Sequence, residues 1–85
     1  MSENPTEKQI ILYGTRWCSD SNRSIHFLNQ HQIAYRWVDI DEDRDGRAFV
    51  LKVNRGMASV PTILFPDGDL LVEPSDRELA TKLKL

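Results

Sequence analysis

Short apolar runs separated by polar turn residues recur along the chain and predict four β-strands. The first run, residues 9–13, is rich in strand formers, as expected for a buried central strand. The other runs cover residues 33–40, 60–65 and 69–72. A Pro-Asp-Gly turn at residues 66–68 separates the last two and predicts a β-hairpin, because proline presets φ and glycine accepts a positive φ.

Polar segments with helical spacing predict three helices. Helix-start residues open the first of these, over residues 19–31. An acidic cluster at residues 41–45 suits the positive end of a helix dipole and opens the second, which should end near Gly56, where glycine can supply a left-handed cap. A capping box at residues 75–78 opens the third. The acidic cluster lacks the ligand spacing of a calcium loop, so we expect no metal there.

The predicted element order is β-α-β-α-β-β-α. We expect an α/β fold with a mixed four-stranded sheet, built from two parallel βαβ connections and a hairpin, with helices on both faces. The chain has 85 residues, which fit one small domain. We place this domain at residues 8–85, after a disordered N-terminal end at residues 1–7.

Composition excludes several classes of function. The net charge of −2 gives no electrostatic basis for binding nucleic acid or a membrane surface. No apolar run approaches the roughly 18 residues of a spanning helix, and the polar start does not resemble a secretory signal. A single cysteine excludes an intramolecular disulfide framework and a multi-cysteine zinc site. We therefore expect a cytoplasmic protein, acting as a monomer.

The one cysteine, Cys18, lies between the first predicted strand and the first predicted helix. Unpaired N–H groups and the dipole at a helix N-terminus stabilise a thiolate, which is the nucleophile in disulfide exchange. Arg16 and Arg23 would add positive potential, whereas Asp20 would oppose a second anion. The sequence leaves the balance of these charges open, together with the alternative that Cys18 is an inert buried residue.

Two further residues fit chemistry at Cys18. Ser21 follows it by three positions, where its hydroxyl can hydrogen-bond to a thiolate but cannot resolve a mixed disulfide as a second thiol would; capping the helix is the alternative role. Pro61 marks a special backbone position, because proline is poorly tolerated inside a central strand. A cis Val60–Pro61 bond is rare on statistical grounds, but it would free nearby backbone groups to pair with an extended ligand.

Several segments together resemble the glutaredoxin family, and within it the mycoredoxin-like glutaredoxins. The resemblance covers residues 10–83. It rests on these segments: YGTRWC at residues 13–18, VDI at 38–40, SVPT at 59–62, DG at 67–68 and EPS at 73–75.

This resemblance implies a thioredoxin fold in which Cys18 is the nucleophile and a cis Pro61 faces it. It also implies a low-molecular-weight thiol, glutathione or mycothiol, as co-substrate, with no tightly bound cofactor and with S-thiolated proteins as substrates. The backbone of that thiol would pair with Val60, and its carboxylate would meet the start of the last helix near Ser75 and Asp76. The alternative role of Ser75 and Asp76 is capping alone.

Other residues can be assigned to the thiol-binding groove on the same resemblance. Trp17 would form one exposed wall, with loop packing as the alternative. Arg16 would attract the carboxylates of the thiol, with Arg23 and Arg55 as further candidates; solvated surface charge is the alternative for all three.

The chain departs from the usual family site in carrying Ser21 where a second cysteine normally stands. The same outline would result from a Cys-to-Ser substitution made to trap a mixed disulfide. We interpret the protein as a thiol–disulfide oxidoreductase that reduces protein–small-thiol mixed disulfides by a monothiol mechanism. The alternatives are a non-catalytic thioredoxin-like binding module, and a carrier in which the Cys18 thiolates of two chains and two small thiols hold an iron–sulfur cluster.

Overall fold

A computed structural model describes residues 9–85, and the predicted disordered end at residues 1–7 lies outside this range. The predicted order of strands and helices is confirmed. The elements are β1 (Ile10–Gly14), α1 (Ser19–Gln30), β2 (Tyr35–Asp39), α2 (Arg44–Val53), β3 (Thr62–Leu64), β4 (Leu70–Val72) and α3 (Asp76–Leu83). None of the helices within residues 9–85 is long and apolar enough to cross a membrane.

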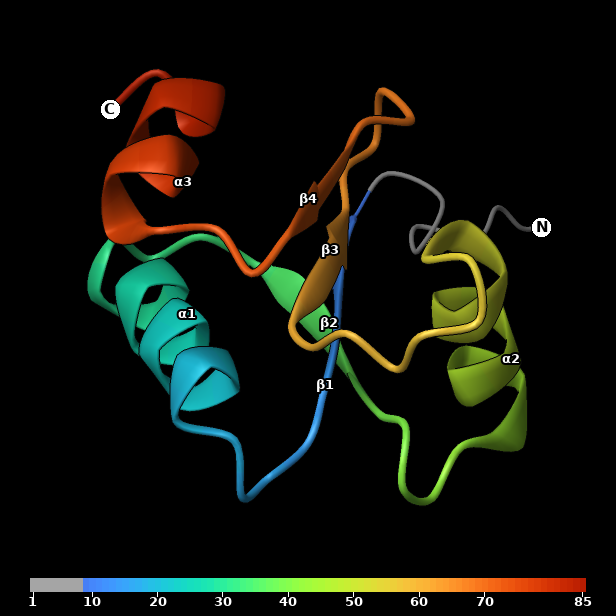
Figure 1. Ribbon diagram of the computed structural model, residues 1–85. Helices are drawn as coiled ribbons and strands as arrows, with labels where there is room; N and C mark the ends of the chain where they lie inside the picture. The colour runs from blue at the N-terminus through green and yellow to red at the C-terminus, as the bar shows by residue number, and fades with distance from the viewer. Residues whose placement is uncertain (1–8) are drawn as a thin grey trace, which may run out of the picture.

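The four strands form one mixed sheet in the order β2-β1-β3-β4. β1 and β2 are parallel, β3 is antiparallel to β1, and β4 is antiparallel to β3. The prediction of two parallel βαβ connections is therefore wrong for the second one. After α2, residues 54–61 return along the sheet to the end where β2 finishes, so β3 runs in the opposite direction to β1 and β2 (Figure 1).

Helices cover both faces of the sheet, with α1 and α3 on one side and α2 on the other (Figure 1). Successive residues of β1 point to opposite faces, so this strand contributes to two cores. The core under α1 and α3 contains Ile10, Leu12, Phe27, Leu28, Ile63, Phe65 and Leu79. The core under α2 contains Tyr13, Val38, Ile40 and Val50. Both cores surround the central strand that leads to Cys18.

The ends of α2 and α3 show why the chain turns where it does. Asp43 caps α2 by accepting a hydrogen bond from the Gly46 N–H at 2.9 Å. At the other end of α2, Arg55 (φ 58°) and Gly56 (φ 88°) both adopt left-handed conformations, whereas the sequence predicts only the glycine to do so. The predicted capping box at residues 75–78 is present at the start of α3.

Candidate active site at Cys18

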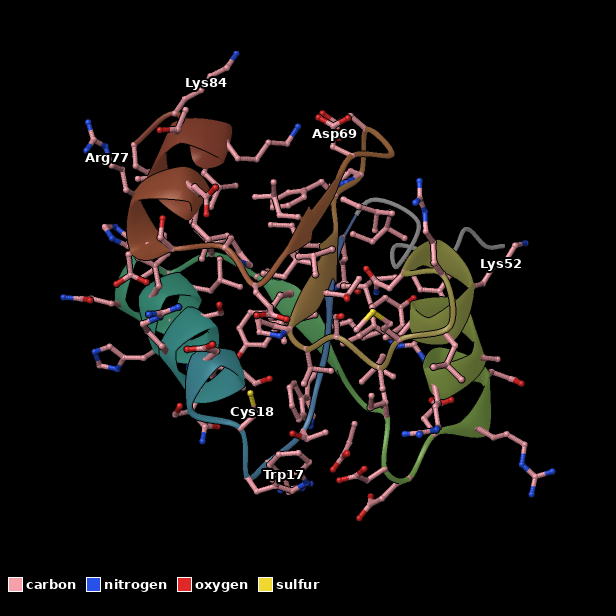
Figure 2. All side chains as sticks on the ribbon, in the orientation of Figure 1. Trp17, Cys18, Lys52, Asp69, Arg77 and Lys84 are labelled. Atoms are coloured by element: carbon pink, nitrogen blue, oxygen red, sulfur yellow. The ribbon has the colours of Figure 1, made fainter. Side chains whose placement is uncertain are left out.

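Cys18 occupies the N-cap position of α1, immediately after the loop that leaves β1. Its backbone is extended, and its carbonyl accepts the first helical hydrogen bond from the Asn22 N–H at 3.0 Å. The side chain is half-buried, and its sulfur lies 3.8 Å from the carbonyl oxygen of Val60. In Figure 2, Cys18 and Trp17 lie together at the end of the molecule where α1 begins. The sulfur is thus partly open to solvent at a helix N-terminus, where backbone N–H groups favour an anion.

The segment that faces Cys18 is fixed by side-chain hydrogen bonds. The Val60–Pro61 peptide bond is cis, in line with the family resemblance. Thr62 donates a hydrogen bond from its hydroxyl to the carbonyl of Ser59 at 2.7 Å. Asn54 donates its side-chain amide to the same Thr62 hydroxyl at 3.1 Å. Sequence reasoning named Thr62 only within the SVPT segment and missed its contact with Asn54, for which the sequence carried no signal.

Arg16 and Trp17, which precede the cysteine, are held by carboxylates at the end of β2. The Arg16 Nε lies 3.3 Å from Asp39 Oδ2, and Trp17 donates its indole N–H to Asp41 Oδ2 at 2.8 Å. Trp17 nevertheless remains 75% exposed. Sequence reasoning missed both aspartates in this role. Their signal was their position, because the carboxyl ends of neighbouring parallel strands meet at one edge of a sheet.

Ser21 lies beneath the loop and not at its surface. Its side chain is fully buried, and a Cβ added at Gly14 would lie only 2.6 Å from its Oγ. Within residues 9–85 this Oγ has no hydrogen-bond partner, so it donates neither to the sulfur of Cys18 nor to a carbonyl of α1. The structure therefore places Ser21 next to the site as a small buried side chain.

The start of α3 carries the other candidate residues. Ser75 accepts a hydrogen bond from the Glu78 N–H at 3.0 Å, so its hydroxyl is engaged in capping. Asp76 is exposed, and its Oδ1 lies 3.9 Å from Nε of Arg23. Arg55 is exposed in the turn that ends α2. The structure thus brings Arg23 and Asp76 together across α1 and α3.

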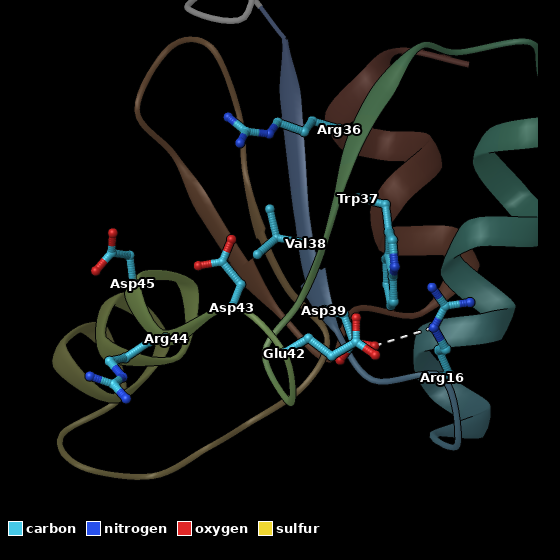
Figure 3. A pocket seen from close by; sticks show the side chains of 9 residues that line it. All are labelled: Arg16, Arg36, Trp37, Val38, Asp39, Glu42, Asp43, Arg44 and Asp45. Carbon is cyan, nitrogen blue, oxygen red and sulfur yellow. Dashed lines mark ion pairs between the residues drawn. The ribbon is translucent and has the colours of Figure 1, made fainter.

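Two cavities lie beside this site, along the free edge of β2. One, of about 500 Å³, is shown in Figure 3; the nine residues that line it include Arg16, Trp37 and Asp39. A second, of about 480 Å³, is lined by Arg16, Asn22, Ile25, Tyr35 and Trp37. Cys18 lines neither of these two cavities. Across residues 9–85, no group of three His, Cys, Asp or Glu side chains is arranged to hold a metal ion.

Cys18 thus lies at the N-terminus of α1, opposite the cis Val60–Pro61 segment. The sequence model of the glutaredoxin family, described as Glutaredoxin, matches residues 10–71. The chain belongs to the glutaredoxin family. This match confirms the resemblance found in the sequence. The family is one of thiol–disulfide oxidoreductases, the class of enzyme that the resemblance implies.

Individual relatives agree with the assignment to this glutaredoxin family. A Mycobacterium tuberculosis protein named as a glutaredoxin is 40% identical over 74 residues, which are 87% of this chain and 88% of the relative. Mycoredoxin 1 of Corynebacterium glutamicum is 28% identical over 75 residues, covering 88% and 92%. The crystal structure of a glutaredoxin from Archaeoglobus fulgidus superposes with a TM-score of 0.74 at 21% identity, covering 99% and 98%. The thioredoxin fold of this glutaredoxin is therefore confirmed.

Proposed function

We propose that this glutaredoxin reduces mixed disulfides between proteins and a small thiol by a monothiol mechanism. The observation that carries the proposal is the sulfur of Cys18, which is half-buried at the N-cap of α1 and faces the Val60 carbonyl. Cys18 is also the one thiol in the sequence, so no second cysteine of this chain can complete the reaction.

The reaction proceeds in two exchanges. The Cys18 thiolate attacks the small-thiol sulfur of a protein–S–S–thiol disulfide, and the protein sulfur leaves as a thiolate that takes up a proton. Cys18 then carries the small thiol as a mixed disulfide. A second small thiol, as its thiolate, attacks the small-thiol sulfur of this adduct. It releases a small-molecule disulfide and regenerates the Cys18 thiolate, so each cycle consumes one free small thiol and converts one mixed disulfide into a protein thiol and a small-molecule disulfide.

An extended small thiol would bind across the open surface around Cys18. The backbone of Val60, next to the cis Val60–Pro61 bond, would pair with a peptide-like segment. The N-terminus of α3 at Ser75 and Asp76 can receive a carboxylate, since helix N-termini bind anions. Arg16 and Trp17, held by the end of β2, would form the opposite wall.

Glutaredoxins use glutathione or mycothiol as the small thiol. Mass spectrometry after exposure of the protein to oxidised glutathione and, separately, to mycothiol disulfide would show which of them is used. A stable adduct on Cys18 with one disulfide and not the other would name the co-substrate.

Because this thiol chemistry needs a reducing compartment, the cytoplasm is the location that we propose.

Replacement of Cys18 tests the mechanism directly. We expect Cys18→Ser to abolish turnover in a mixed-disulfide reduction assay, because a hydroxyl is not ionised at neutral pH. Ser21→Ala is the matched control and should retain activity, since the Ser21 hydroxyl makes no hydrogen bond within the described chain. Turnover that persists in Cys18→Ser would contradict the proposal.

The same protein preparation tests the two alternatives, a non-catalytic binding module and an iron–sulfur cluster carrier. A wild-type protein without turnover whose Cys18 alkylates like a free cysteine would support a non-catalytic binding module. Anaerobic reconstitution with iron and sulfide, followed by absorption spectroscopy and iron counting, tests the cluster carrier. A cluster bound by wild type and lost in Cys18→Ser would support that function.

A further inference from the structure

The half-exposed side chain of Arg23 at the surface of α1 contacts three groups of the protein. Its Nη2 donates to the carbonyl oxygen of Pro74 at 3.4 Å and lies 3.4 Å from Oδ1 of Asp20. Its Nε lies 3.9 Å from Oδ1 of Asp76. One guanidinium therefore meets a carboxylate of its own helix, a backbone carbonyl ahead of α3, and a carboxylate in the first turn of α3.

The first of these contacts concerns the charge next to the nucleophile. Asp20 lies in the first turn of α1, two residues after Cys18, and its side chain is 46% exposed. An unpaired carboxylate there would disfavour a thiolate at Cys18. Arg23 is placed at i,i+3 to Asp20, a spacing at which opposite charges on a helix surface attract each other. The pair thus offsets the negative charge closest in sequence to the sulfur.

The other two contacts concern the position of α3. Pro74 is buried, and it immediately precedes Ser75, the N-cap of α3. By binding the Pro74 carbonyl, Arg23 ties the segment that opens α3 to the helix that begins at Cys18. The reacting sulfur and the N–H groups at the start of α3 belong to different helices. A link between α1 and α3 therefore sets the distance between the sulfur and these N–H groups.

We propose that Arg23 is a positioning residue, which holds the start of α3 against α1 and neutralises Asp20, and which does not itself bind the small thiol. This inference rests on the proposed function. It differs from the sequence-based expectation that Arg23 attracts the carboxylates of the ligand. The guanidinium is already directed at three acceptors of the protein, and its planar fork suits several acceptors at once.

Three variants, Arg23→Ala, Asp20→Asn and the double variant, separate the contact of Arg23 with Asp20 from its contact with Pro74. The rate of Cys18 alkylation by iodoacetamide at pH 7 reports the charge effect without any ligand. We expect Arg23→Ala to slow alkylation by about twofold to fivefold, the size of effect that a partly exposed charge pair produces. The double variant should return to the wild-type rate, because the unpaired carboxylate has also been removed.

Turnover reports on the contact of Arg23 with the Pro74 carbonyl. We expect Arg23→Ala to raise the KM for the small thiol by about threefold to tenfold with a smaller change in kcat. The double variant should keep the raised KM, since removing Asp20 does not restore the tie to Pro74. Arg23→Lys should recover the wild-type rate of alkylation but should lower the raised KM only in part, because an ammonium lacks the planar fork of a guanidinium. Arg77→Ala removes an exposed arginine that points away from α1 and should behave as wild type (Figure 2).

Amide hydrogen exchange without ligand distinguishes positioning from direct binding. Faster exchange in the first turn of α3 in Arg23→Ala is expected if Arg23 holds this segment, and a residue that only binds ligand would leave it unchanged. Unchanged exchange, or a wild-type alkylation rate in Arg23→Ala, would overturn the inference. If instead the wild-type protein shows no turnover, the proposed function fails, while alkylation and exchange still decide the role of Arg23.

Discussion

At the scale of single residues, Gly14 and Ser21 limit each other's size beneath the active-site loop. A Cβ at position 14 would lie 2.6 Å from Oγ of Ser21 and 3.0 Å from Cζ3 of Trp37. Because Ser21 is fully buried, it cannot withdraw into solvent. We expect Gly14→Ala to lower the free energy of unfolding by about 1–3 kcal/mol, as overpacking does. Urea denaturation measures this change.

The double variant Gly14→Ala/Ser21→Ala provides the control for this prediction. Removal of the Ser21 hydroxyl relieves the shortest contact, so the double variant should be more stable than Gly14→Ala alone. A midpoint for Gly14→Ala equal to that of wild type would show that the loop rearranges freely.

Sequence reasoning at this scale predicted the position of Cys18 at a helix start, but not the partners of its neighbours. The place of Cys18 at a helix start follows from local order, because a strand, a short loop and a helix succeed one another along the chain. The partners of Arg16 and Trp17 are Asp39 and Asp41, which lie more than twenty residues away and meet them only because β1 and β2 are adjacent and parallel. Local pattern assigned residues 41–45 to a helix start instead.

At the scale of elements, Lys82 joins α3 to the turn between β3 and β4. Its ammonium is hydrogen-bonded to both Asp67 and Asp69, and it lies 5.3 Å from the centre of the Phe65 ring. The hydrogen bond from Lys82 lowers the pKa of Asp67, and the one to Asp67 raises the pKa of Lys82. The stabilisation that follows is lost as pH falls through the lowered pKa of Asp67, and also as pH rises through the raised pKa of Lys82.

Lys82→Gln should therefore lower the melting temperature most at neutral pH. The difference from wild type should shrink as pH falls through the lowered pKa of Asp67, and in about 1 M salt, which screens surface charges. Lys52→Gln is the matched control on the exposed face of α2, and it should change little at any pH (Figure 2). An equal destabilisation by Lys82→Gln at pH 7 and pH 2 would mean that the lysine acts through packing alone.

The direction of β3 shows where prediction of elements from sequence stops. Hydrophobic runs and caps identified every helix and strand of the described chain, since these signals are local. The same runs do not encode whether a strand after a helix runs parallel or antiparallel. That depends on the path of residues 54–61, whose return along the sheet is set by the left-handed turn at Arg55 and Gly56 and by contacts such as Asn54 with Thr62.

At the scale of the whole molecule, the two cores share β1 and should unfold together. Leu28→Ala in the core under α1 and α3 should cost about 2–5 kcal/mol. Val50→Ala in the core under α2 removes less apolar volume and should cost less. For both variants, circular dichroism and tryptophan fluorescence should give coincident urea transitions, as a two-state domain requires. Separate midpoints for the two probes would show that the faces unfold independently.

The sulfur of Cys18 and the carbonyl that it faces are 42 positions apart in the sequence. No fragment such as the isolated strand–loop–helix around Cys18 can reproduce this encounter, since pairing of β1 with β3 creates it. The proposed reaction at Cys18 therefore requires intact tertiary structure. As denaturant is added, turnover should be lost at the same concentration at which the sheet unfolds. Cys18 should then react like a cysteine in an unstructured peptide.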